Sequence, residues 1–173
     1  ALEAELWRGS HHDFAMQEAG PETLLGDFST TEHEHFGEVS SFTERDGASW
    51  VRTRGEDGAP VELPARYAFG VDPLQQVLVE LPRGRLQAFD VAWDSRPGEA
   101  GGGRWFHLHP GEPVPPGDEL HWAGALMNWN SMCAHCHMTD FKKNYDAATD
   151  TFASTWREHG VAGEALLERN HHH

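Results

Sequence analysis

The chain has 173 residues, enough for one domain with a hydrophobic core or for a domain with a small additional module. Its 13 basic and 28 acidic side chains give a formal net charge of −15, which repels nucleic-acid phosphates and anionic lipid surfaces and favours basic partners. No apolar run approaches the roughly 18 residues of a membrane-spanning helix, so neither nucleic-acid binding nor a membrane span is expected.

The first 35 residues are expected to form a helical segment. Good helix formers occupy residues 2–7, and the pattern at residues 14–18 predicts a further helical turn before the Gly20-Pro21 pair. The alternating Glu-His-Glu-His sequence at residues 32–35 is interpreted as a solvated loop.

From residue 36 to about residue 109 the pattern changes to strands. Six short runs are separated by short turn signals, which predicts an antiparallel sheet rather than βαβ units. The strongest signal is Asp46-Gly47, which lies between two alternating runs and predicts a two-residue hairpin turn.

The remaining residues predict a loop followed by helical pieces. Residues 110–120 are rich in proline and glycine and indicate a loop. The segment from His121 to His137 is rich in Trp, Met and His and has helical character around the two cysteines. Residues 152–169 can form a terminal helix.

The expected fold class is therefore α+β, within a single haem-binding domain of residues 1–170. An antiparallel β-sheet over about residues 36–109 is expected to carry a helical, loop-rich c-type haem-binding part from both termini. That part comprises residues 1–35 and the haem-attachment segment, residues 110–170. Residues 171–173 are three histidines that look like the start of an affinity tag, and they are left out of the chemistry.

Both cysteines lie in the sequence Cys133-Ala134-His135-Cys136-His137, which matches the C-x-x-C-H attachment site of c-type haem. Two thiols about one helical turn apart can add to the two vinyl groups on one edge of a porphyrin. The residue that follows then presents its imidazole to the iron. We therefore interpret Cys133 and Cys136 as the attachment residues of one covalent haem c, and His137 as the proximal iron ligand.

Two other interpretations of the cysteine pair compete with haem. A zinc site requires more ligands, and the chain has no other cysteine and no downstream histidine pair at zinc-ligand spacing apart from the terminal histidines. A thioredoxin-like dithiol belongs in a parallel βαβ context, whereas this chain predicts antiparallel strands. Apolar walls that exclude water favour haem, and five Trp and Met residues lie near the motif: Trp122, Met127, Trp129, Met132 and Met138.

Several long stretches resemble the haem-binding part of multihaem c-type cytochromes that are often fused to tetratricopeptide repeats. The stretches include WRGSHHDFAMQ, YAFGVDPLQQVLVELPRGRLQAFDVAWDSRP, RWFHLHP and NWNSMCAHCHMTDFKKNYDAATDTFASTW. The resemblance covers roughly Trp7 to Ala165 and implies an exported electron carrier, periplasmic or extracellular, with bis-histidine haems. The chain departs from the family where Gly163, Leu166 and Leu167 replace a second C-x-x-C-H, and it lacks the repeats.

A histidine is expected on the distal side of the iron. His12 matches the histidine of the family's Ser-x-His stretch and is the first choice, and the neighbouring His11 is its alternative. His107 and His121 also match positions seen in the family and are further alternatives. The nearby methionines are disfavoured because they lie too close in sequence to the motif to reach the opposite haem face.

The expected function is electron transfer through this haem. The partners would be redox proteins of basic character, or other haem-bearing subunits. The alternative is a haem enzyme, peroxidase-like or nitrogen-oxide-reducing, with an open sixth coordination position. No nucleophile–base pair stands out in the sequence, so we expect an electron carrier rather than a catalyst.

Overall fold

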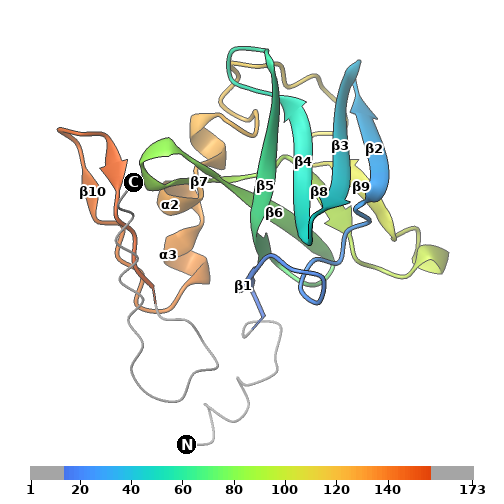
Figure 1. The fold of residues 1–173 in the computed structure, drawn as a ribbon, viewed down its shortest axis with the longest axis horizontal. Helices are drawn as coiled ribbons and strands as arrows, with labels where there is room; N and C mark the ends of the chain where they lie inside the picture. The colour runs from blue at the N-terminus through green and yellow to red at the C-terminus, as the bar shows by residue number, and fades with distance from the viewer. Residues whose placement is uncertain (1–13, 157–173) are drawn as a thin grey trace, which may run out of the picture.

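The computed structural model describes residues 14–156, which are mostly β structure (Figure 1). Nine strands form one antiparallel sheet, and two more form a small separate hairpin. The main strands are β1 (Met16–Glu18), β2 (Ser29–His35), β3 (Glu38–Arg45), β4 (Ala48–Arg54), β5 (Pro60–Phe69), β6 (Leu74–Leu81), β7 (Arg85–Ala88), β8 (Val91–Asp94) and β9 (Arg104–His107). The remaining elements are β10 (Tyr145–Asp146), β11 (Thr151–Phe152), α2 (Trp129–Met132), α3 (Ala134–His137) and 3-10 turns at Pro82–Gly84, Gly98–Ala100 and Ala125–Met127.

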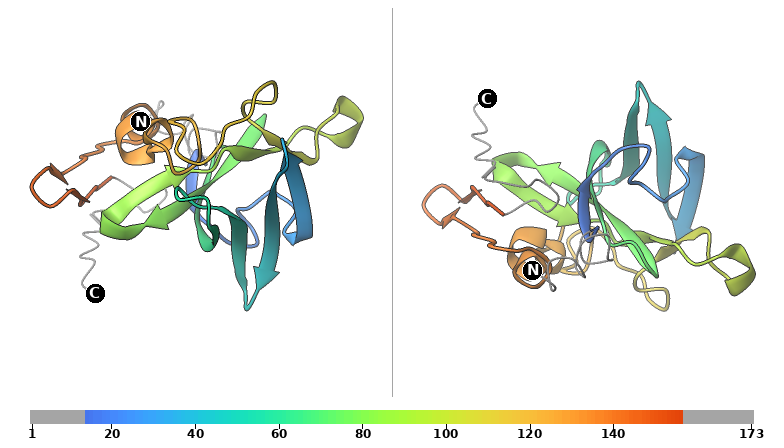
Figure 2. Two further views of the ribbon diagram at one scale, coloured as in Figure 1. Left: turned by 90° about the horizontal axis from the view of Figure 1, so that it is seen from above. Right: turned by 90° about the horizontal axis from the view of Figure 1, so that it is seen from below.

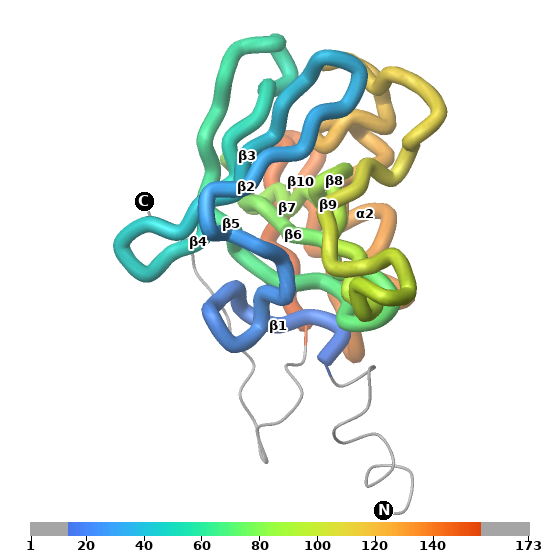
Figure 3. Tube along the Cα trace, turned by 90° about the vertical axis from the view of Figure 1, so that its right-hand side faces the viewer, coloured from blue at the N-terminus to red at the C-terminus, as the bar shows by residue number. Residues whose placement is uncertain are grey.

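The main sheet curls into a nearly closed barrel (Figures 1 and 3). Its strand order is β2-β3-β4-β5-β6-β8-β9, with β1 paired to β5 and β7 paired to β6. The two end strands, β2 and β9, meet through side chains: the indole Nε1 of Trp105 donates to the Thr31 hydroxyl at 3.1 Å. Side-chain contacts therefore close the barrel at this seam.

The predicted hairpin at Asp46-Gly47 is confirmed. Strands β3 and β4 pair so that Arg45 lies opposite Ala48, which leaves two residues in the turn. Asp46 has φ = 53° and Gly47 has φ = 75°. Positive φ at both central residues is the geometry of the type I′ turn, which Asp-Gly favours.

Two hydrophobic cores lie on opposite faces of β6. Val77 and Val79 belong to the first core, inside the barrel, whereas Leu78 belongs to the second core on the outer face. The side-chain period of two explains why this strand is apolar on both faces. The first core is built around Phe28, Phe42, Val51, Phe89, Val91, Trp105 and Trp122, and the second around Tyr67, Phe69, Leu86, Ala88, Met127, Trp129 and Ala134.

The helices α2 and α3 pack on the outer face, beside β7 and the β10–β11 hairpin (Figures 1 and 2). The buried Asn130 fixes this position, because its Oδ1 accepts the backbone N–H of Leu86 in β7 at 2.7 Å. Its Nδ2 donates to the Ser154 hydroxyl at 3.0 Å, which ties the helices to the segment after β11. At the start of α2, Asn128 caps the helix by accepting the N–H of Ser131.

The expected α+β fold class is wrong, because the described residues form a mostly β, barrel-like sheet rather than a sheet joined to a helical, loop-rich haem part. Met16–Glu18, predicted as a helical turn, forms β1 because it pairs with Tyr67–Phe69 of β5. Residues 32–35, interpreted as a loop, belong to β2. Thr151–Phe152 forms β11 where the terminal helix was predicted to begin. The predicted helix at residues 2–7 lies outside the described residues.

Candidate functional site

The C-x-x-C-H motif lies at the junction and end of two short helices. Cys133 separates α2 from α3, and its carbonyl accepts the backbone N–H groups of Cys136 at 3.2 Å and His137 at 3.3 Å. These hydrogen bonds make the motif one tight helical turn, so the two cysteines lie on neighbouring positions of one helix face. The helical character predicted around the cysteines is confirmed.

The two thiols differ in their exposure. Both cysteines are free, Cys133 half-buried against the second core and Cys136 exposed. Burial raises the pKa of the Cys133 thiol, and the neighbouring Cys136 raises it further. Cys133 is therefore held in its protonated form at neutral pH, while Cys136 faces solvent.

The imidazole of His137 is exposed and stands against an aromatic ring. Its ring centroid lies 4.9 Å from that of Phe69, with the planes at 73°. Neither ring nitrogen has a hydrogen-bond partner among residues 14–156. An imidazole that binds iron needs a ring nitrogen that is not already hydrogen-bonded, as His137 offers within this range.

A cluster of aromatic side chains in the second core packs next to the motif. Trp129 is fully buried, and its ring makes edge contacts with Phe69, Phe141 and Trp156. The Nε1–H of Trp129 is buried without a hydrogen-bond partner in the described part of the chain. A buried N–H without an acceptor is costly, so a polar group supplied by a bound cofactor would stabilise this position.

The first choice for the distal ligand, His12, and its neighbour His11 lie outside the described residues. The chain that follows them enters the structure close to the motif. Ala15 accepts the backbone N–H of Gly70 at 2.8 Å, and Met16 pairs with Phe69, the residue that contacts His137. Met16 also packs against the second core, as Cys133 and Met138 do.

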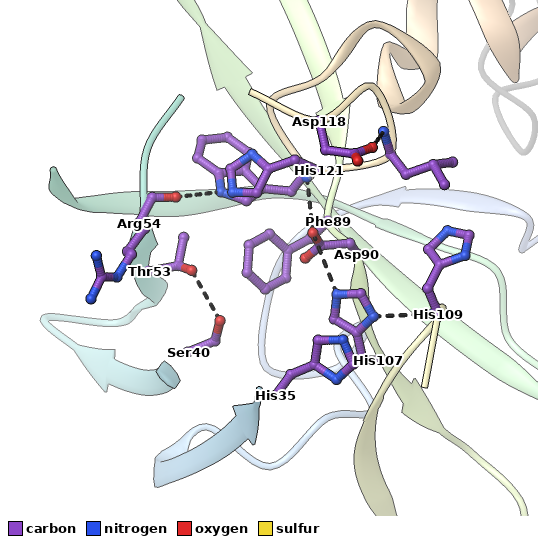
Figure 4. A network of polar contacts seen from close by, with 12 residues as sticks. His35, Ser40, Thr53, Arg54, Phe89, Asp90, His107, His109, Asp118 and His121 are labelled. Atoms are coloured by element: carbon purple, nitrogen blue, oxygen red, sulfur yellow. Dashed lines mark hydrogen bonds and ion pairs between the residues drawn. The ribbon is translucent and has the colours of Figure 1, made fainter. Parts of the chain in front are cut away.

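The two alternative ligands, His107 and His121, belong to a different site (Figure 4). Both are buried, with exposures of 5% and 2%, and both line a cavity that contains no residue of the C-x-x-C-H motif. The Nε2 of His107 lies 3.7 Å from the Asp90 carboxylate, and its ring stacks on that of His35. The structure therefore brings these histidines together with each other, not with His137.

Sequence reasoning missed the partners of this histidine cluster. Thr31, His33 and His35 alternate with two exposed glutamates, and this period of two is the signal of a strand with one inward face. The signal was overlooked because the inward residues are polar rather than apolar. No sequence pattern indicates that Asp90 belongs to the site, because its burial, with 5% of the residue exposed, is visible only in the fold.

Within residues 14–156, no group of three or more His, Cys, Asp and Glu side chains is arranged to hold a metal ion. No helix in this part of the chain is long and apolar enough to span a membrane. Comparison with protein-family models, with curated proteins and with solved structures finds no match for this chain.

Proposed function

We propose that this protein is a c-type cytochrome that transfers single electrons through one haem, attached at Cys133 and Cys136 and bound to iron through His137. The observation that carries the proposal is the state of the motif: a helical turn with two free thiols and an imidazole that has no hydrogen-bond partner among residues 14–156, packed against an aromatic core. The sequence resemblance to multihaem c-type cytochromes points the same way.

Three features of the described residues suit a covalently attached haem. Cys133 and Cys136 lie one helical turn apart and can both reach one edge of a porphyrin. His137 follows them directly and is exposed, and no residue of the described range 14–156 hydrogen-bonds to its ring nitrogens. The Nε1–H of Trp129 would gain an acceptor if a polar substituent of the porphyrin reached it.

A bound haem supplies reversible one-electron iron chemistry, and its protein ligands and burial set the potential. His137 would bind the iron of this haem. Phe69, Trp129 and Trp156 keep water from one side of the site, which favours burial of an apolar ring. The half-buried Cys133 anchors the attachment turn to the same core.

The N-terminal segment is the best source of the second axial ligand. Met16 is held beside Phe69, and a chain of four residues spans at most about 14 Å when fully extended. His12 lies four residues before Met16, so it can reach the neighbourhood of His137. Bis-histidine ligation would follow.

The expected partners are basic redox proteins or other haem-bearing subunits, because the chain carries a net charge of −15. We further propose a periplasmic or extracellular location, as the family resemblance implies. Haem attachment then takes place where the reduced thiols are presented outside the cytoplasm.

The test is a count of covalent haems on the full chain expressed with haem-maturation factors. The intact mass should exceed that of the polypeptide by one haem, and the spectrum in alkaline pyridine should show thioether-linked haem. The Cys133→Ala/Cys136→Ala variant should lose both signals, whereas the exposed neighbour Met132→Ala should keep them. Stoichiometric zinc without a Soret band would overturn the proposal.

The alternative function, a haem enzyme with an open sixth position, gives a different result with added ligands. A carrier with two histidine ligands binds carbon monoxide or cyanide only after a native ligand is lost. Rapid binding by the unmodified protein would favour the enzyme instead.

A further inference from the structure

A second polar site lies in the barrel, away from the C-x-x-C-H motif. A cavity of about 100 Å³ extends between β2, β9 and the loop of residues 113–115 (Figure 4). Three of its polar side chains are almost fully buried: Asp90 and His107 are 5% exposed, and His121 is 2% exposed. Buried polar groups are normally hydrogen-bonded, so those that lack partners here point to a ligand.

Backbone N–H groups fix the tautomer of both buried imidazoles. The N–H of His109 donates to Nδ1 of His107 at 3.0 Å, and the N–H of Ala123 donates to Nδ1 of His121 at 3.3 Å. A ring nitrogen that accepts a hydrogen bond is unprotonated, so each neutral ring carries its proton on Nε2. Burial lowers the pKa of His121 and favours this neutral form.

Among residues 14–156, neither Nε2–H group has an acceptor within hydrogen-bond distance. The Nε2 of His107 lies 3.7 Å from Asp90 Oδ2, beyond normal hydrogen-bond length. No residue in the described range accepts a hydrogen bond from the Nε2 of His121. A protonated Nε2 cannot bind a metal, which agrees with the absence of a metal-binding group among residues 14–156. Both rings therefore act as hydrogen-bond donors.

Asp90 supplies the complementary acceptor. Its Oδ2 accepts the backbone N–H of Trp122 at 2.9 Å, while its Oδ1 has no donor among the described side chains and backbone. Among the described residues, no lysine or arginine forms an ion pair with Asp90, and its one basic neighbour is His107, at 3.7 Å. The cavity thus combines one buried carboxylate oxygen with two imidazole N–H donors.

We propose that this cavity binds a small uncharged molecule that both donates and accepts hydrogen bonds, with the chemistry of a primary amide. Its oxygen would accept from His107 and His121, and its N–H would donate to Oδ1 of Asp90. The carboxylate repels anions, and an ammonium ion offers no acceptor to the two imidazoles. The cavity volume of about 100 Å³ has room for a molecule of a few heavy atoms.

The proposal does not depend on the haem and has its own test. The full chain, labelled with ¹⁵N, is titrated in parallel with acetamide, acetate and ethylammonium while the imidazole and indole N–H signals are followed by NMR. We expect both His107 and His121 to show the Nε2–H tautomer before any addition. Acetamide should then shift their signals in a saturable way at lower concentration than the two charged probes. An Nδ1–H tautomer, tighter binding of acetate or ethylammonium, or no saturable shift would each overturn the proposal.

The Asp90→Asn variant tests the ligand class directly. Its carbonyl oxygen can still accept from Trp122, while its amide turns the remaining cavity acceptor into a donor. Acetamide binding should weaken at least tenfold, and acetate should become the preferred probe. Glu32→Ala, at an exposed position of β2 outside the cavity lining, is the control, and its binding of acetamide should be unchanged. If Asp90→Asn fails to fold, His121→Phe should weaken acetamide binding at least tenfold, and unchanged binding in either folded variant would overturn the proposal.

Discussion

The imidazole rings of His35 and His107 are stacked, with their centroids 3.7 Å apart and their planes within 5° of each other. His35 belongs to β2 and His107 to β9, the two end strands of the sheet. The Nε2 of His35 also bonds to the carbonyl of Glu112 at 2.9 Å. The stack therefore joins the seam of the barrel to the loop that follows β9.

His35→Ala should open this seam. Loss of the ring contact and of the Glu112 hydrogen bond should lower the free energy of unfolding by about 1–2 kcal/mol. Urea denaturation measures the change, and hydrogen exchange should accelerate in β2 more than in β4. Glu32→Ala, at an exposed position of the same strand, is the control and should stay within about 0.5 kcal/mol of the unmodified chain. Equal losses in the two variants would contradict a special role for the stack.

The buried histidines should make the fold sensitive to acid. Burial lowers the pKa of His121 below its usual 6.5, so the folded state binds a proton less readily than the unfolded state. The free energy of unfolding should therefore be insensitive to this group above pH 6.5 and should fall as the pH drops below it. The slope from one such histidine approaches about 1.4 kcal/mol per pH unit until the folded state also takes up the proton.

His33 should add to this fall in the free energy of unfolding below pH 6.5. Its pKa is lowered, mainly by burial and then by the nearby His107 and His35. Denaturant unfolding at a series of pH values measures the slope. His121→Gln removes one titrating group and should flatten the curve below pH 6.5, whereas Ser131→Ala, which changes an exposed side chain that does not titrate, should leave the slope unchanged. A curve of the same slope in His121→Gln would refute the assignment.

Asn130 should control the position of the attachment helices. Asn130→Leu keeps the approximate size of the side chain but leaves the N–H of Leu86 buried without its acceptor. Such a loss costs about 1–3 kcal/mol, and it should reduce haem incorporation because α2 leads directly into Cys133. Thermal unfolding and the yield of covalent haem measure the two effects. Ser131→Ala, at an exposed position of α2, is the control and should change neither stability nor haem yield. A normal haem yield in a destabilised Asn130→Leu variant would contradict a role of Asn130 in haem attachment.

The sequence predicts structure well where neighbouring residues determine it. The hairpin follows from Asp46-Gly47, whose residues adopt positive φ readily, and the helical turn at the cysteines follows from their local sequence. Strand β1 could not be predicted in this way, because Met16 and its neighbours have no strand pattern in their sequence. They form a strand because they pair with β5. Tertiary pairing overrides local propensity at such short edges.

The site shows the same division between local and long-range information. Cys133, Cys136 and His137 are adjacent in sequence, so their motif can be recognised without a fold. The cavity of His107, His121 and Asp90 is assembled from separate segments, and the sequence alone assigned its two histidines to the iron as alternatives. Only the fold shows that these two histidines line the same cavity and that this cavity does not include the C-x-x-C-H motif.

We expect His12 to be the distal ligand of the iron. Strand β1 holds Met16 beside Phe69, and Phe69 contacts His137, the proposed proximal ligand. With haem attached, His12→Ala should convert a low-spin absorption spectrum to a high-spin one and allow carbon monoxide to bind the reduced iron without displacing a ligand. His135→Ala, at an exposed position within the motif, is the control and should remain low-spin. A low-spin spectrum that persists when His11 and His12 are both replaced would show that the ligand comes from elsewhere.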